Sequence, residues 1–145
     1  MPFRNPPPEA VRELLSKARS IAVLGLSPNP GRPSHGVAAA LQGFGYKIIP
    51  VRPAVDEVLG EKAYPDLKHL PGPVDIVDVF RAPEFVADIV AQCIALRAPA
   101  LWLQEGVVDE AAAAKAQAAG IFTVMDRCIY KDYVAAFGHA SRKDI

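Results

Sequence analysis

The feature that most narrowly limits the fold of this chain is an alternation of short apolar segments with segments of helical periodicity. Nearly continuous apolar runs of this length are typical of strands that are covered on both faces of a sheet. Since helical segments separate them, the pattern predicts parallel strands joined by helical crossovers. The predicted strands occupy residues 20–25, 47–51, 74–80, 100–103 and 121–125.

Helices are predicted between these strands from the spacing of apolar residues and from the residues that begin and end helices. In the first, Val11, Leu14, Leu15 and Ala18 repeat at helical spacing, and Pro8 suits its first turn. Residues 52–73 are rich in proline and predict a long connection with at most short structured pieces. The other predicted helices span residues 37–44, 83–93, 109–120 and 130–137.

Together these elements predict a Rossmann-like α/β domain, an open doubly wound sheet of about five parallel strands flanked by helices. A chain of 145 residues is expected to form one domain over residues 1–145. Within it, residues 1–7 are expected to be an N-terminal extension and residues 140–145 a polar tail. Ligands of such sheets lie outside the carboxyl ends of the strands, so functional residues are expected there.

Charge and cysteine content argue against several classes of function. Sixteen basic residues balance sixteen acidic ones, so no long-range field favours nucleic acid as a partner. The apolar runs are far shorter than the roughly 20 residues of a membrane span. The N-terminal residues lack the features of a signal peptide, which favours the cytoplasm. Cys93, Cys128 and three scattered histidines lack the spacing of metal ligands, so no metal site is expected.

The turn after the first predicted strand is a candidate phosphate-binding loop and runs from Gly25 to Gly36. Glycines let backbone N–H groups approach phosphate, and the following helix offers a positive dipole end. The spacing is neither the G-x-G-x-x-G of dinucleotide enzymes nor a G-x-x-x-x-G-K-[ST] loop, so a proline-rich turn without a ligand is the alternative. Hydroxyl and guanidinium groups favour binding. The candidate residues are Gly25, Ser27, Pro28, Gly31, Arg32 and Ser34.

The second predicted strand ends at Arg52 and Pro53, a pair that bears on the choice of nucleotide. Enzymes that use NAD carry an acidic residue about 20 residues past the glycine turn, where it holds the ribose hydroxyls. Arginine at that place suits a phosphorylated ribose, as in NADP or in the 3′-phosphate of coenzyme A. The alternative is an arginine that is merely solvated at a strand end.

The remaining strand ends add candidates on the same edge of the sheet. Asp78 lies within the third strand and is expected to have a hydrogen-bonded structural role rather than a catalytic one. Arg81 follows it and is expected either to balance Asp78 or to contact phosphate. Residues 104–106 supply an amide and a carboxylate, but no nucleophile is spaced with the carboxylate. Cys128 places a thiol at the fifth strand end, where a small buried hydrophobic role is the alternative.

Five segments at these strand ends resemble the stand-alone CoA-binding domain family, relatives of the N-terminal domain of the succinyl-CoA synthetase α subunit. The sequence departs from that family at Arg52, where the second strand often ends in Asn-Pro. The phosphohistidine domain and β subunit of the synthetase have no counterpart in these residues, so the resemblance implies no acyl-CoA ligase activity. The matching segments are residues 25–34, 45–53, 75–81, 102–106 and 125–128.

The resemblance also implies a place for each part of the ligand. The loop from Ser27 to Ser34 is expected to wrap the pyrophosphate, and Arg52 and Pro53 to flank the adenosine. The other wall of the nucleotide crevice is expected to be formed by Val79, Phe80, Arg81 and Pro83. The residues expected nearer the pantetheine are Gln104, Glu105 and Gly106.

The sequence therefore predicts a protein that binds CoA or an acyl-CoA at the carboxyl edge of the sheet. We expect it not to be an enzyme, because no set of catalytic residues is recognisable. Two alternatives stay open: a small NADPH-dependent reductase or a fragment of one, which Arg52 permits, and a CoA-binding subunit of a larger complex. A protein partner and a homodimer both remain compatible with the sequence.

Overall fold

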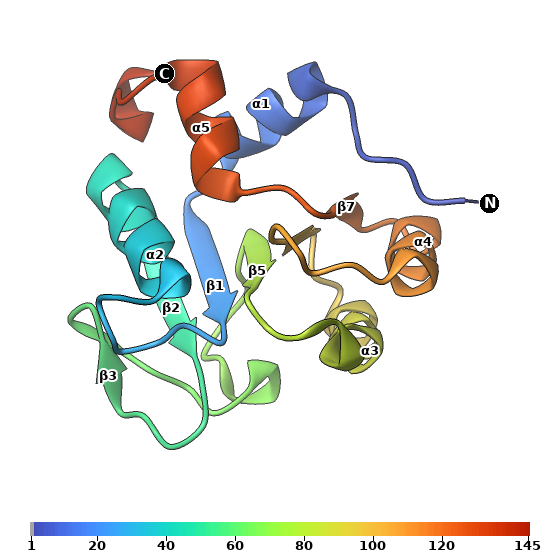
Figure 1. The fold of residues 1–145 in the computed structure, drawn as a ribbon, viewed down its shortest axis with the longest axis horizontal. Coiled ribbons are helices and arrows are strands. Elements are labelled where there is room, and N and C mark those ends of the chain that lie inside the picture. The colour runs from blue at the N-terminus through green and yellow to red at the C-terminus, as the bar shows by residue number, and fades with distance from the viewer. Residues whose placement is uncertain (1) are drawn as a thin grey trace.

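The computed structural model describes residues 2–145 and contains a five-stranded parallel sheet (Figure 1). Its strands are β1 (Ser20–Leu24), β2 (Lys47–Val51), β5 (Ile76–Val79), β6 (Ala100–Leu103) and β7 (Phe122–Val124). They lie in the order β2-β1-β5-β6-β7, and each neighbouring pair is parallel. The predicted open doubly wound sheet is confirmed. The direction of strand order reverses between β1 and β5, which is where sheets of this kind bind ligands.

Helices cover both faces of the sheet, as Figure 1 shows. On one face α1, α2 and α5 pack with Ile21 and Val23 of β1, and on the other α3 and α4 pack with Ala22 and Leu24. Successive strand residues thus face opposite apolar layers, which explains why the strands are apolar throughout. Within residues 2–145, no helix combines the length and apolar character needed to cross a membrane. The helices are α1 (Pro8–Lys17), α2 (Pro33–Phe44), α3 (Val86–Leu96), α4 (Glu110–Ala118) and α5 (Ile129–Phe137).

The helix α2 begins earlier than the sequence predicts. The expected loop extends to Gly36, whereas the first residue of α2 is Pro33. Proline suits this position because its φ is already helical and a helix leaves its first N–H groups unpaired in any case. Ser34 and Gly36 therefore lie in the first turn of α2, and the loop after β1 is shorter than expected.

The long connection after β2 contains the short pieces that the sequence predicts. A small hairpin is formed by β3 (Glu57–Val58) and β4 (Glu61–Lys62), and a 3₁₀ turn covers Leu67–His69. The strand β5 then begins at Ile76, two residues later than predicted. Asp75, the residue before β5, is not part of the strand. Its carboxylate accepts hydrogen bonds from the backbone N–H groups of Arg19 and Ser20, at the start of β1, at 2.7 and 3.1 Å.

Both terminal segments pack against the domain. Phe3 is buried in the core, and the side-chain amide of Asn5 exchanges two hydrogen bonds with the backbone of Met125, just past the edge strand β7. At the other end, Arg142 donates to the carbonyl of Ala18 at 3.1 Å, beyond the end of α1. The predicted N-terminal extension and polar tail are thus held to the surface by specific contacts.

Candidate functional site

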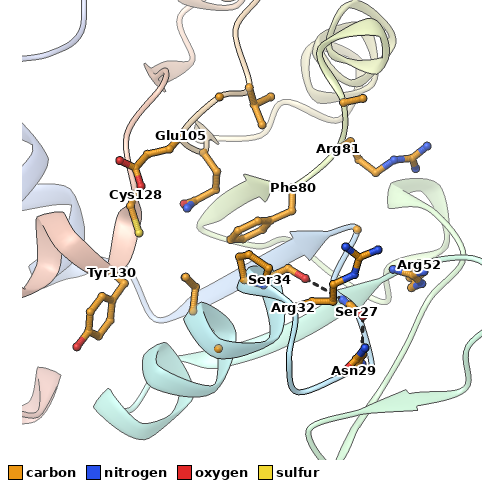
Figure 2. A pocket seen from close by; sticks show the side chains of 18 of the residues that line it. Ser27, Asn29, Arg32, Ser34, Arg52, Phe80, Arg81, Glu105, Cys128 and Tyr130 are labelled. Carbon is orange, nitrogen blue, oxygen red and sulfur yellow. Dashed lines mark hydrogen bonds between the residues drawn. The ribbon is translucent and has the colours of Figure 1, made fainter.

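A cavity of about 1290 Å³ opens at the carboxyl edge of the sheet, where the strand order reverses. Its walls come from the segments that follow β1, β2, β5 and β6 and from the first turns of α2 and α5 (Figure 2). We refer to this cavity as the edge pocket. The residues that the sequence proposes as ligand contacts and that line it are Gly25, Ser27, Pro28, Arg32, Ser34, Arg52, Phe80, Arg81, Pro83, Gln104, Glu105, Gly106 and Cys128.

Three of the proposed contacts lie outside this lining. Val79 is fully buried at the end of β5, where it packs in the apolar core. Gly31 is exposed, and its N–H already donates to the side-chain oxygen of Asn29 at 2.9 Å. Pro53 is also exposed and lies beyond the end of β2. A position at or just beyond a strand end is therefore not enough to predict that a residue lines the pocket.

Sequence reasoning missed the part of the lining that comes from helix faces. Val37 and Ala40 contribute from α2, and Tyr130 and Lys131 from the first turn of α5. The apolar spacing of α2 and α5 predicts which residues face the sheet, but the angle between the two helices is set by tertiary packing. Tyr130 and Lys131 could have been predicted from the sequence, because a helix that follows a parallel strand has its first turn at the edge of the sheet where ligands bind.

The loop after β1 is held in shape by its own side chains. The N–H of Ser27 donates to Ser34 Oγ at 3.0 Å, and the N–H of Asn29 donates to Ser27 Oγ at 3.1 Å. His35 Nδ1 lies 2.9 Å from the Ser27 carbonyl and donates to it, since a carbonyl oxygen can only accept. These bonds preorganise the loop, so a ligand that binds there meets little ordering cost. The hydroxyls of Ser27 and Ser34 therefore shape the loop as well as lining the pocket.

Three arginines give one end of the edge pocket its charge. Arg32, Arg52 and Arg81 all line it, and none forms an ion pair with a carboxylate among residues 2–145. Figure 2 shows Arg32, Arg52 and Arg81 toward the same side of the pocket, opposite Glu105, Cys128 and Tyr130. The guanidinium of Arg81 lies over the ring of Phe85, 4.1 Å from its centroid. Because the chain has no net charge, this local concentration of cations would favour an anionic ligand through nearby charges rather than a long-range field.

The opposite end of the edge pocket carries a different set of groups. Gln104 is almost fully buried, and its Oε1 accepts the N–H of Ile129 at 3.1 Å. Glu105 and Lys131 form an exposed ion pair at 3.1 Å, which contributes little to stability because solvent screens it. Cys128 is the N-cap of α5 and lies between Glu105 and Tyr130 in Figure 2. The pocket thus joins a cationic end to an end with an amide and a thiol.

Asp78 does not have the hydrogen-bonded role that the sequence led us to expect. Its side chain is fully buried, and neither carboxyl oxygen has a hydrogen-bond partner among residues 2–145. Burial raises the pKa of Asp78 well above its usual range. Its strand neighbours are Val23, which has no polar side-chain group, and Trp102, whose indole N–H donates to the Arg127 carbonyl at 2.8 Å instead. Arg81 forms no ion pair with Asp78 among residues 2–145, so of the two roles expected for Arg81 only the contact with phosphate stays open.

Within residues 2–145, no three histidine, cysteine, aspartate or glutamate side chains lie close enough together to hold a metal ion. The polar groups that line the edge pocket are mainly guanidinium, hydroxyl, amide and thiol groups, and the carboxylate of Glu105 is paired with Lys131. Such groups suit an organic anion rather than a cation.

Comparisons with known proteins agree with this geometry. A family model described as a CoA binding domain matches residues 19–133. The Bacillus subtilis protein YneT, described as uncharacterized, is 43% identical over 127 residues, covering 88% of this chain and 94% of YneT. A structure of a hypothetical protein from Pyrococcus horikoshii superposes with a TM-score of 0.88 at 33% identity and covers 94% of this chain and 98% of that one.

A shorter similarity links the chain to a large enzyme. The ADP-forming acetate–CoA ligase II of Archaeoglobus fulgidus is 34% identical over 77 residues. These residues make up 52% of this chain but 11% of the ligase. The chain therefore matches one small part of that enzyme.

Proposed function

We propose, from the premise that this chain belongs to the CoA-binding domain family, that it binds coenzyme A or an acyl-CoA in the edge pocket. The nucleotide half of the ligand lies at the end that holds the three arginines. The pantetheine arm runs along the carboxyl edge of the sheet toward Gln104 and Cys128. The chain binds this ligand without catalysing a reaction on it.

The observation that carries this proposal is the set of unpaired arginines beside a preorganised loop. CoA bears three phosphate groups, two in its pyrophosphate and one on the 3′-oxygen of its ribose. Arg32 is the N-cap of α2 and suits the pyrophosphate, whereas Arg52 directly follows β2, at the place where NAD enzymes have an acid. A phosphorylated ribose therefore fits Arg52 better than the free hydroxyls of NAD do.

The absence of catalysis is proposed from the groups that line the pocket. Glu105 is the carboxylate of the lining, and it is exposed and paired with Lys131. A general base needs a nucleophile or a substrate proton within hydrogen-bond reach, with its pKa near the working pH. No neighbouring pair of pocket groups has that arrangement, so binding accounts for the site better than chemistry does.

A second candidate is a CoA-binding subunit of a larger complex. It is favoured by the match to one short part of an acetate–CoA ligase, since a related sequence there makes up only 11% of a much longer enzyme. A partner chain that supplies the remaining chemistry would then co-purify with this one. Purification of the tagged chain from its own cells separates this candidate from a free-standing carrier.

Removing the side chain of Arg32 or of Arg52 is expected to weaken CoA binding by roughly 10- to 100-fold, because a charge-assisted hydrogen bond contributes about 1.5–3 kcal/mol. The variants are Arg52→Ala and Arg32→Ala, measured by titration calorimetry with CoA and dephospho-CoA. If Arg52 holds the 3′-phosphate, dephospho-CoA binds the wild-type protein about as weakly as CoA binds Arg52→Ala.

The matched control is Arg97→Ala, which removes an exposed arginine at the end of α3, next to the start of β6 and thus at the opposite edge of the sheet. Its affinity for CoA should equal that of the wild-type protein. Binding of NADP without binding of CoA would refute the proposal and favour the reductase alternative.

A further inference from the structure

The amide end of the edge pocket contains a thiol that the binding proposal does not use. Cys128 lines the pocket, is 8% exposed and lies across from Arg52 and Arg81 in Figure 2. Its side chain makes no capping hydrogen bond with α5, although it occupies the N-cap position. The sulfur is therefore free to meet a ligand, and the positive end of a helix lies next to it.

A cation accompanies the thiol on the same helix turn. Lys131 also lines the pocket, and its pKa is raised, mainly by its hydrogen bond and ion pair with Glu105 and to a lesser degree by the charge of Cys128. The thiolate is the reacting form of cysteine, and thiol–disulfide exchange needs a sulfur that the disulfide can reach. The position of Cys128 in the pocket wall gives a bound ligand that access.

Gln104 provides an independent indication that a ligand lies beside this thiol. The side chain is 4% exposed, and its oxygen is occupied by the N–H of Ile129, the residue after Cys128. Its amide nitrogen has no hydrogen-bond partner among residues 2–145, and the residue lines the pocket. The nitrogen is not one of the fully buried atoms that lack a partner, so it is open to the pocket and is placed to meet an acceptor on a bound molecule. The pantetheine arm of CoA carries two amide carbonyl groups that can accept a hydrogen bond from this nitrogen.

We propose that Cys128 forms a reversible mixed disulfide with the thiol of CoA, while Gln104 holds the pantetheine arm beside it. This inference rests on the proposed function, because it needs the nucleotide half of CoA to be seated among the arginines. The site would then bind reduced CoA reversibly and retain CoA covalently under oxidising conditions.

The covalent step is a thiol–disulfide exchange with CoA disulfide as the oxidant. One half of the disulfide occupies the pocket, and the Cys128 thiolate attacks the sulfur of that half. A bond forms between Cys128 Sγ and this sulfur while the original S–S bond breaks. The other CoA leaves as a thiolate and takes up a proton from solvent. Cys128 is thereby oxidised, and the released CoA is reduced.

The test is the intact mass of the protein after incubation with CoA disulfide. The expected result is a gain of one CoA moiety, which peptide mapping places on Cys128 and which a dithiol reductant removes. Because the pocket prepositions the reagent, glutathione disulfide at the same concentration should react roughly a hundredfold more slowly. Adenosine 3′,5′-bisphosphate, which has no thiol, should protect Cys128 by occupying the nucleotide end.

The second cysteine supplies the matched control. Cys93 is fully buried in α3, and burial raises its pKa to about 12, so it should stay unmodified. The variant Cys93→Ala should still form the adduct, whereas Cys128→Ser should not. Equal rates with the two disulfides, or an adduct on Cys93, would overturn the inference.

Calorimetry of the wild-type protein with reduced CoA, in the presence of a reductant, separates the two proposals. If reduced CoA binds but CoA disulfide yields no adduct, the disulfide inference fails and the proposed function stands. If reduced CoA does not bind, the proposed function fails, and an adduct formed in that case reflects ordinary thiol reactivity and overturns the inference too.

Discussion

Replacing Asp78 with valine is expected to raise the free energy of unfolding at neutral pH by about 2 kcal/mol and the melting temperature by roughly 4–8 °C. The carboxyl group lies between Val23 and Trp102 in the sheet and has no hydrogen-bond partner among residues 2–145. A buried polar group without a partner costs free energy, and a branched apolar side chain of similar size avoids that cost. Thermal and urea denaturation of Asp78→Val measure the gain.

The gain should depend on pH in a defined direction. Burial raises the pKa of Asp78 in the folded protein; the backbone N–H of Val79 opposes this slightly, although its geometry falls short of a hydrogen bond. The folded protein therefore holds this proton more tightly than the unfolded chain does. In the wild-type protein the free energy of unfolding falls as pH rises from the unfolded pKa, about 3.9, through the raised folded value. The advantage of the valine variant is smallest in acid and grows as pH rises.

The variant Asp78→Asn separates charge from polarity. Asparagine keeps buried polar atoms but does not titrate, so it should flatten the pH dependence without giving the full gain in stability. A valine variant that is less stable than the wild-type protein would mean that the carboxyl group has a partner, such as an internal water. Because Asp78 lies two residues before Phe80 in the pocket wall, CoA titration of the same variants shows whether the site uses this acid.

Replacing Gly25 with alanine should have the opposite effect, a loss of roughly 3 kcal/mol in the free energy of unfolding together with a loss of CoA affinity. Gly25 has a φ of +79°, which a side chain makes costly. A Cβ atom at this position would lie 2.8 Å from the carbonyl oxygen of Phe80 and 3.0 Å from Cδ of Arg81. The first of these is a backbone atom, so β5 and the loop after β1 must move apart.

The control for Gly25→Ala is Gly43→Ala, measured by the same urea denaturation and CoA titration. Gly43 lies within α2, and an added Cβ there meets nothing within 4 Å. Alanine in a helix interior should raise the free energy of unfolding by about 0.5–1 kcal/mol and leave CoA binding unchanged. If Gly25→Ala instead kept both stability and affinity, the close approach of β1 and β5 would not shape the pocket as described.

The sequence was informative about the pocket because strand ends can be located from apolar runs. Once the runs ending near Gly25, Arg52 and Phe80 are taken as parallel strands, their carboxyl ends must share one edge. The doubly wound order then brings residues together that are far apart in the chain. This reasoning located most of the pocket wall without any knowledge of side-chain positions.

Other features depended on tertiary contacts that no local pattern records. The amide of Asn5 bonds to Met125, which is 120 residues away, and nothing near Asn5 indicates this contact. Val37 and Ala40 line the pocket because of the way that α2 packs against the core. The unpaired state of Asp78 was also hidden, since a sequence shows that a strand residue is polar but not whether its neighbours in the sheet can bond to it.

The central claim is that CoA lies in the edge pocket, and the most direct test is a CoA titration followed by backbone amide NMR. The account predicts large shifts for the amides of Ser27, Arg32, Arg52 and Gln104, which line the pocket. The amide of Leu96, in a separate smaller cavity, should not shift. Saturating CoA that left the edge pocket amides unchanged, or that moved only those near Leu96, would contradict the account.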